Sequence, residues 1–140
     1  TFIDGLHTFD QALKDFINAE RFSNKRSVAL FHDILPTSPL PALRKRETKM
    51  WVGDTWKVMI ILKKFRPDLQ IMTIPTFPSG LGVVTNMDAS STLLHDSFDR
   101  ICEEAMAYEL DSYQPQLNQH LNVVENDFDA VAQRLDPVKK

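Results

Sequence analysis

Apolar residues recur along this chain with helical spacing in some segments and as short continuous runs in others. One helical face collects four large apolar side chains: Phe9, Leu13, Phe16 and Ile17. Thr8 and Gln11 before and within this segment have the spacing of a capping box, which predicts a helix from Thr8 to about Phe22. The run from Ser27 to Phe31 shows no alternation, which predicts a strand covered on both faces.

The next segments continue this alternation of strand and helix. Phe2 and Ile3 form an apolar stretch that ends at Asp4-Gly5, and we expect a strand there. A second helix is predicted to begin at the N-cap residue Asp54 and to end before Pro67. Strands over Leu69–Ile74 and Leu81–Thr85 follow, and their short connection makes them an antiparallel hairpin.

This order of elements predicts an α/β fold. Two strands joined by a helix form a right-handed crossover and pair in parallel, and the hairpin adds a reversed strand at the edge. We therefore expect a partial Rossmann-like sheet of two parallel strands and a carboxyl-terminal hairpin over residues 1–88, followed by a helical tail over residues 89–140.

The helical tail carries a second pattern. Six apolar residues repeat with the spacing of a heptad seam: Leu117, Leu121, Val124, Phe128, Val131 and Leu135. Two interpretations are equally favoured, a helix that packs on its own domain and a helix that contacts a second chain. The tail is thus a candidate oligomerisation element.

Composition narrows the class of protein. The chain has 140 residues, 43% hydrophobic and 25% charged, which is typical of one globular domain with a core of its own. The longest apolar run, Val58–Leu62, is too short to span a membrane. Cys102 is the only cysteine, which excludes an internal disulfide and favours a reducing, cytoplasmic setting.

Charge is divided unevenly along the chain. The formal net charge is −3, but residues 1–67 carry +5 and residues 68–140 carry −8. Such a division favours docking between halves or between chains, and the acidic second half argues against nucleic acid as the main partner.

Candidate chemistry lies at the ends of the first two predicted strands. Asp4 and His7 follow the first, and His32 and Asp33 follow the second. Parallel neighbours bring their carboxyl ends to one edge of a sheet, so these four side chains are expected to share a site. Their oxygen and nitrogen donors suit Mg²⁺, Mn²⁺ or Zn²⁺, and alternatively His7 alone acts as a general base.

Each of these residues also has a structural interpretation. Asp4 can hydrogen-bond the following turn, His7 can merely begin the helix, and the pair His32-Asp33 can satisfy amides of the next loop. Their joint occurrence at two successive strand ends favours function.

The same residues carry a resemblance to a known family. Residues 2–9 read F-I-D-G-L-H-T-F, Asp15 follows in the helix, and residues 28–33 read V-A-L-F-H-D. This resembles the second half of class I S-adenosylmethionine-dependent methyltransferases, in particular a group whose fourth strand reads F-I-D-G-x-H-x-Y and whose fifth ends in H-D or D-D. The resemblance covers about residues 1–86 and makes the hairpin the family's sixth and seventh strands. Phe9 replaces the usual Tyr, and His32 stands where metal-dependent relatives tend to have Asp.

The resemblance implies transfer of a methyl group from S-adenosylmethionine to a small polar acceptor, most simply to an oxygen. His7 would remove the acceptor's proton, or a cation such as Mg²⁺ or Mn²⁺ held by Asp4, His32 and Asp33 would acidify it. A long loop over residues 34–50 would then cover the acceptor. Three prolines and three basic residues occupy it: Pro36, Pro39, Pro41, Arg44, Lys45 and Arg46. The basic residues would bind an anionic substrate or, equally, form a solvated surface.

The chain departs from the family in its glycines. No Gly-rich turn opens a helix, because Gly80 and Gly82 precede a strand. We expect the carboxyl-terminal part of a longer enzyme, a self-associating fragment that covers an unpaired strand edge, or a degenerate binding module. A homo-oligomer is therefore predicted. Two other functions stay open: an interaction domain without catalysis that associates through its tail, and a metal-dependent hydrolase that uses all four His and Asp residues.

Overall fold

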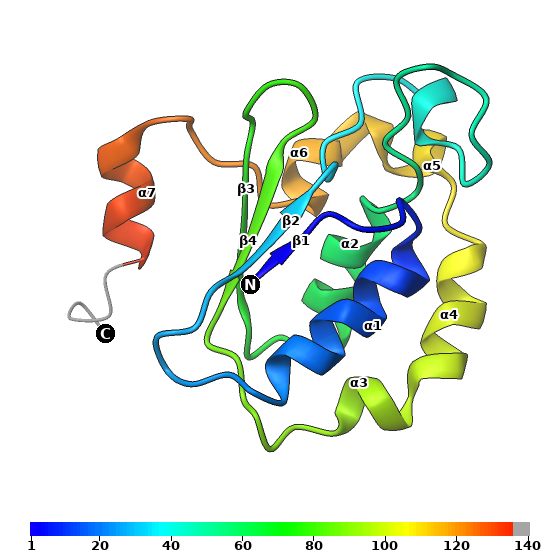
Figure 1. The fold of residues 1–140 in the computed structure, drawn as a ribbon. Helices are drawn as coiled ribbons and strands as arrows, with labels where there is room; N and C mark the ends of the chain where they lie inside the picture. Colours follow the sequence, from blue (N-terminus) through cyan, green and yellow to red (C-terminus); the bar gives the residue numbers. More distant parts are fainter. Residues whose placement is uncertain (136–140) are drawn as a thin grey trace.

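The computed structural model describes residues 1–135, which form one four-stranded sheet with helices on both sides (Figure 1). The strands are β1 (Phe2–Ile3), β2 (Ala29–His32), β3 (Gln70–Ile74) and β4 (Leu81–Thr85). The longer helices are α1 (Phe9–Glu20), α2 (Lys57–Phe65), α4 (Phe98–Met106) and α7 (Phe128–Leu135). The short helical turns are η1 (Leu40–Ala42), α3 (Leu93–Asp96), α5 (Leu110–Tyr113), η2 (Gln114–Gln116) and α6 (Leu117–His120).

The strands are arranged in the order β1-β2-β4-β3. β1 and β2 pair in parallel, with Ile3 opposite Phe31, and α1 forms the crossover between them. β4 runs antiparallel to both of its neighbours, β2 and β3. The predicted α/β fold is thus confirmed, and the hairpin joins the sheet through β4, so that the later strand lies inside and the earlier one at the edge.

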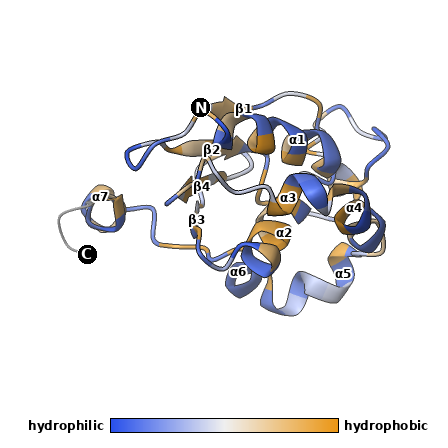
Figure 2. Cartoon of the chain, turned by 90° about the horizontal axis from the view of Figure 1, so that it is seen from below, coloured by the Kyte–Doolittle hydropathy of each residue, from blue (hydrophilic) through white to orange (hydrophobic). Residues whose placement is uncertain are grey.

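The main core lies between the sheet and the helices on one side of it. Helices α1 and α2 pack against the strands on this side, and α4 packs on α2 (Figures 1 and 2). Phe9, Phe16, Phe31, Trp56 and Ile61 are almost fully buried there. Alternate residues of the strands point to the opposite side, which α7 covers in part.

The second side of the sheet has a smaller apolar cluster. Met72, Ile74 and Val83 are its buried members, and Val124 and Val131 from the tail pack against them. The tail therefore packs on the second face of the sheet of its own domain, which was one of the two interpretations of its apolar pattern.

The amino-terminal cap of α1 differs from the prediction. Thr8 occupies the N-cap position, but its side chain makes no capping hydrogen bond, and Gln11 donates to Asp15 instead. The amide of Phe9 donates to Oδ1 of Asp54 at 3.0 Å. Asp54 was expected to cap the second helix, which begins only at Lys57, so its carboxylate serves a helix distant in sequence.

The predicted heptad seam is wrong as a continuous helix. Asn122 adopts a left-handed backbone conformation (φ 51°), and α6 ends just before it. The chain then bonds to the edge of the sheet, where Thr73 donates to the carbonyl of Asn122 and accepts from the amide of Val124. Because these backbone bonds replace helical ones, the six apolar residues do not form one stripe. Phe128 is 84% exposed, whereas Leu121 is fully buried.

Membrane insertion has no candidate in the described part of the chain. Within residues 1–135, no helix combines the length and apolar character that crossing a bilayer requires.

Candidate functional site

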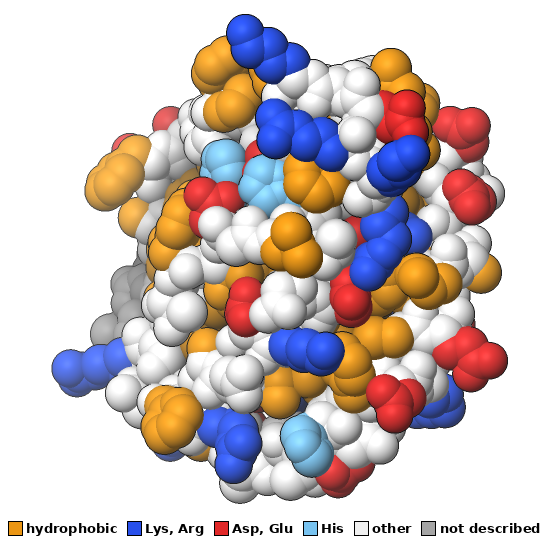
Figure 3. Space-filling model, turned by 45° about the vertical axis from the view of Figure 1, so that its right-hand side comes forward, with side chains coloured by type: hydrophobic (Ala, Val, Ile, Leu, Met, Phe, Trp, Pro, Cys, Tyr) orange, Lys and Arg blue, Asp and Glu red, His pale blue; other side chains and the backbone are white. Residues whose placement is uncertain are grey.

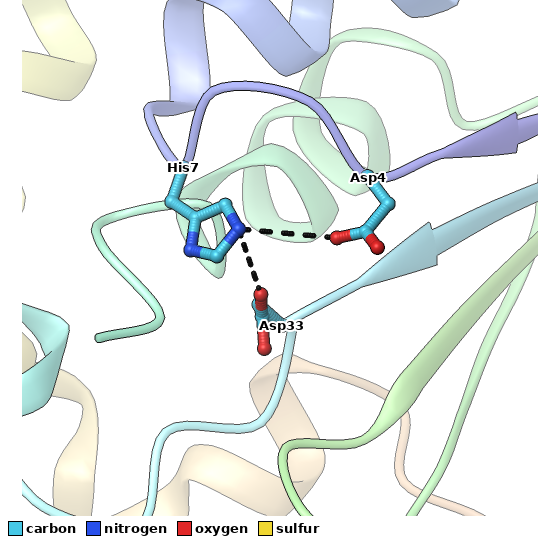
Figure 4. Close-up of side chains that lie close together, drawn as sticks. All are labelled: Asp4, His7 and Asp33. Atoms are coloured by element: carbon cyan, nitrogen blue, oxygen red, sulfur yellow. Dashed lines mark ion pairs between the residues drawn. The ribbon is translucent and has the colours of Figure 1, made fainter. Parts of the chain in front are cut away.

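The ends of β1 and β2 bring four titratable side chains together at one edge of the sheet. Because the two strands are parallel neighbours, Asp4 and His7 after β1 meet His32 and Asp33 at the end of β2. Figure 4 shows that Asp4 and Asp33 both point toward the ring of His7. The predicted convergence of these four residues is confirmed.

Two imidazoles share two carboxylates in this cluster. Nε2 of His7 lies 3.2 Å from Oδ2 of Asp33 and 3.9 Å from Oδ1 of Asp4. Nδ1 of His32 lies 3.2 Å from the same Asp33 oxygen and 3.3 Å from the same Asp4 oxygen. Each carboxylate therefore contacts both rings, and a proton or cation placed there interacts with all four groups.

The other nitrogen of His7 fixes the state of its ring. Nδ1 lies 2.8 Å from the carbonyl oxygen of Trp51, which only accepts hydrogen bonds, so Nδ1 carries a proton. In the neutral ring, Nε2 then has a lone pair that faces two carboxylates. A proton or a cation bound at Nε2 would therefore contact both carboxylates. The ring of Trp51 stacks on that of His7, with the centroids 5.2 Å apart, and limits its rotation.

Asp33 is the most deeply placed member of the cluster. Its side chain is 8% exposed, whereas those of Asp4, His7 and His32 are 29–39% exposed. Its backbone is left-handed (φ 58°), which turns the chain sharply after β2. Its Oδ1 accepts a hydrogen bond from the hydroxyl of Ser79, so Oδ2 remains for the two histidines.

The cluster has the donor set of a divalent-cation site. Single ligand atoms of Asp4, His7 and Asp33 all lie within 4.8 Å of one another. Carboxylate oxygens with one or two imidazole nitrogens suit Mn²⁺ or Zn²⁺ better than Mg²⁺, which favours oxygen alone. The set of atoms brought together includes His7, whereas the sequence suggested His32 as the nitrogen ligand and His7 as the base.

A cavity of about 290 Å³ opens beside the cluster, and we call it the His7 cavity. His7 and Asp33 line it together with their direct contacts, Trp51 on His7 and Ser79 on Asp33. Arg46, Lys49, Met50, Val52 and Pro78 complete the lining. Figure 3 shows two histidines beside an acidic side chain on this face, with Lys and Arg side chains close by. The cavity can therefore hold a small molecule in contact with His7 and near positive charge.

The three basic residues predicted to bind substrate have different positions. Arg46 lines the His7 cavity, and its guanidinium donates to the carbonyls of Thr48 and Lys49. The Lys45 side chain is 89% exposed and lies 3.9 Å from Glu47. Arg44 lies outside the lining of this cavity.

Arg44 belongs to a charged group at the start of α1. It pairs with Asp10 at 2.8 Å and with Asp54 at 3.3 Å. Burial is the largest single effect on each partner and opposes its charged form. The hydrogen bond between them and the attraction of opposite charges, with contributions from Asp54 and Thr8, together outweigh burial, so the pKa of Arg44 is raised and the pKa of Asp10 is lowered.

Two residues of the site, Ser79 and Gly53, gave no signal in the sequence. Ser79 lies in the hairpin connection and bonds Asp33, and Trp51 supplies the carbonyl and the stacking surface for His7. Gly53 has φ 63°, and a Cβ there would lie 1.7 Å from the carbonyl oxygen of His7. Only a residue without a side chain allows this close approach. Each of these contacts joins segments far apart in the chain, so local patterns do not reveal them.

Comparison with known proteins identifies no family. A scan against protein-family models gives no match, and searches of curated proteins and of solved structures find none that is similar.

Proposed function

We propose that this chain forms the acceptor side of an S-adenosylmethionine-dependent methyltransferase that acts on a hydroxyl group of a small polar molecule. The observation that carries the proposal is the orientation of His7, whose Nδ1 is held by the carbonyl of Trp51 and whose Nε2 faces Asp33. The resemblance of residues 2–9 and 28–33 to that family supports it, as does the hairpin that follows in the sheet.

His7 is suited to accept a proton from a hydroxyl group. S-adenosylmethionine, when bound, supplies an electrophilic methyl group to the acceptor oxygen. Because Nδ1 already carries a proton, Nε2 is the basic atom of the neutral ring. The Asp33 carboxylate, 3.2 Å from Nε2, stabilises the imidazolium that forms when this atom takes the proton.

The His7 cavity positions the acceptor for this proton transfer. Trp51, Met50 and Pro78 give it an apolar lining, and Lys49 and Arg46 attract an acceptor with a negative group. The side chain of Lys49 makes no ion pair within residues 1–135, so its charge is free for a ligand.

A divalent cation is a second way to lower the pKa of the acceptor hydroxyl. Asp4, His7 and Asp33 would hold it, with His32 adjacent to both carboxylates. The cation would supply Lewis acidity, and the two carboxylates would offset its charge. In this arrangement His7 is a ligand and not the base.

Calorimetric titration with S-adenosylmethionine tests the proposal. We expect binding in the micromolar range. In a radioactive methyl-transfer assay with a panel of hydroxylated acceptors, His7→Gln should reduce transfer about 10²–10⁴-fold at unchanged cofactor affinity. His95→Gln, an exposed histidine elsewhere, is the matched control. Absence of cofactor binding would reject the proposal.

Metal titration distinguishes a mechanism with a bound divalent cation from one in which His7 is the general base. If a cation occupies the cluster, Mn²⁺ or Zn²⁺ raises the melting temperature of chelator-treated protein, and Asp33→Asn removes this shift. Asp96→Asn serves as a control on the surface. A metal-dependent hydrolase is favoured only if metal binds tightly and S-adenosylmethionine does not bind.

Self-association is a further part of the proposal. β1 lies at the end of the strand order and is only two residues long, so its outer edge has no partner among the described strands. Phe2 on this strand is 57% exposed. Sedimentation velocity should show a species larger than 16.1 kDa. A monomer at high concentration would contradict this prediction.

A further inference from the structure

A second cavity, of about 420 Å³, lies between the start of α2 and the segment that joins α4 to α5. We call it the Lys57 pocket. It shares no lining residue with the His7 cavity. Its size is within the range of small-molecule sites. Polar residues at its inner wall are Arg44, Asp54, Trp56 and Lys57, and Glu109 and Asp111 also line it.

The carboxylate at the inner wall already has its partners. Asp54 is buried and accepts the amide of Phe9, and Arg44 pairs with it while also bonding Asp10. Its lone pairs are therefore used within the protein. Asp54 and Asp10 together balance the charges of Arg44 and Lys57, so the inner wall has hydrogen-bond donors in excess without a large net charge.

Lys57 is the main unfilled donor. Its side chain is 9% exposed, and its ammonium lies 3.7 Å from Oδ2 of Asp54, which is beyond hydrogen-bond distance. The nitrogen instead lies over two aromatic rings, 5.3 Å from that of Phe9 and 5.9 Å from that of Trp56. Burial lowers the pKa of Lys57, although the charges of Asp54 and Glu109 oppose this. An acceptor in the pocket would complete the coordination of the ammonium.

The indole N–H of Trp56 is a second donor that lacks an acceptor. Nε1 of Trp56 is buried and has no hydrogen-bond partner in the described part of the chain. Buried donors without partners are rare, because each costs about 1–3 kcal/mol. The Trp56 indole N–H is one such donor. It is adjacent in sequence to Lys57, whose ammonium lies beyond hydrogen-bond distance of Asp54, and both residues line this cavity. Together they indicate that an acceptor group from a ligand belongs there.

The outer part of the pocket has the opposite character. Glu109 and Asp111 are exposed, and no ion pair joins either of them to a basic side chain of residues 1–135. Apolar side chains of Leu43, Met106 and Leu110 line the space as well. Donors inside and carboxylates outside require a ligand with a negative end, a positive end and an apolar part.

We infer that the Lys57 pocket binds a free amino acid with an apolar side chain. The ligand's carboxylate accepts hydrogen bonds from Lys57 and Trp56, its ammonium contacts Glu109 and Asp111, and its side chain packs on Met106 and Leu110. A simple carboxylate would be repelled by the outer acids, and a simple amine would leave the inner donors unfilled. The pocket therefore selects the zwitterion by its arrangement of charge.

Binding of three matched probes to the full chain tests this inference. L-leucine is the zwitterion, 4-methylpentanoate lacks the ammonium, and 3-methylbutylamine lacks the carboxylate. In calorimetric titrations, leucine should bind at least tenfold more tightly than either analogue. Equal affinities, tighter binding of an analogue, or no binding of leucine would overturn the inference.

Variants assign the two ends of the ligand. Lys57→Met should weaken leucine binding at least tenfold and leave the affinity for 3-methylbutylamine unchanged. The double variant Glu109→Gln, Asp111→Asn should weaken leucine binding by a similar factor, and it should not weaken the binding of 4-methylpentanoate. Lys25→Met, an exposed lysine of a distant loop, should change nothing. Equal loss in the control, or no loss in the two test proteins, would contradict the assignment.

Nitrogen NMR of the unmodified protein gives a readout that does not depend on variants. The chain has two tryptophans, and their indole N–H groups give two separate signals. Nε1 of Trp51 already donates to the carbonyl of Leu43, whereas that of Trp56 is free. Leucine should move the Trp56 signal and leave the Trp51 signal in place. Movement of Trp51 alone would place the ligand elsewhere and overturn the inference.

Discussion

The candidate site depends on single residues in two loops, the one after β1 and the one before α2. The carbonyl of His7 lies where a side chain at position 53 would begin, and the ring of His7 bonds to the carbonyl of Trp51 two residues earlier. The loop after β1 and the end of the long loop before α2 thus hold each other in place. The site depends on this contact between two loops as much as on the strands.

Gly53→Ala tests this contact. The left-handed backbone at position 53 and the overlap with the carbonyl of His7 should together cost at least about 2 kcal/mol in the free energy of unfolding. Urea denaturation measures the loss. Gly5→Ala is the matched control, because its Cβ would meet its nearest neighbour at 3.5 Å, and it should change stability by less than about 0.5 kcal/mol. Similar stability of the two variants would show that the loops do not touch as described.

At the scale of elements, α1 is capped by a residue that the chain reaches much later. Asp54 is 45 positions beyond Phe9, whose amide it accepts. It also pairs with Arg44 and lies near Lys57, so one buried carboxylate joins the start of α1, the long loop and α2.

Asp54→Ala should therefore destabilise the protein far more than removal of the local cap. It leaves the amide of Phe9 without its acceptor, Arg44 with Asp10 alone and the ammonium of Lys57 without a nearby carboxylate, at a cost of at least about 2 kcal/mol. Thr8→Val removes the hydroxyl that local spacing assigns to the cap, and it should cost less than about 0.5 kcal/mol. Thermal and urea unfolding of both variants give the comparison. A larger loss of stability in Thr8→Val than in Asp54→Ala would show instead that Thr8 caps the helix.

The tail offers a second comparison between elements. Leu121 and Phe128 both belong to the apolar repeat, but the first is fully buried and the second is 84% exposed. Leu121→Ala should cost about 2–5 kcal/mol, and Phe128→Ala less than about 0.5 kcal/mol. Denaturant midpoints measure both. Dissociation of an oligomer by Phe128→Ala would instead support association through this residue.

Local sequence patterns predicted most elements correctly. They failed where a segment forms hydrogen bonds with backbone that is distant in sequence. The hairpin strand Leu81–Thr85 and the start of α1 are as expected, because apolar runs and periodicity act over a few residues. The tail is different, since Asn122 and Val124 bond to Thr73 at the edge of β3. The convergence of His7 and Asp33 followed from parallel pairing alone. Trp51, Ser79 and Gly53 did not, because loop positions are set by tertiary contacts.

For the molecule as a whole, the sheet should be unequally stable across its width. β4 is paired with β3 over five residues and with β2 over four, whereas β1 contributes two residues at the edge. Hydrogen exchange followed by NMR should show the slowest amides in β4 and much faster exchange at Ile3. Val83 and Val84, both buried, are the reference amides. Equal protection of β1 and β4 would indicate that β1 has a further strand beside it.

The position of β4 also bears on how the chain folds during synthesis. Among the four described strands it is the last to leave the ribosome, yet it lies between β2 and β3, which precede it. Until residue 85 has emerged, β2 and β3 lack the strand that pairs with both of them. The parallel pair of β1 and β2, joined by α1, then has an unpaired edge at β2. A nascent chain stalled before this point should remain susceptible to protease, and acquisition of resistance should be abrupt.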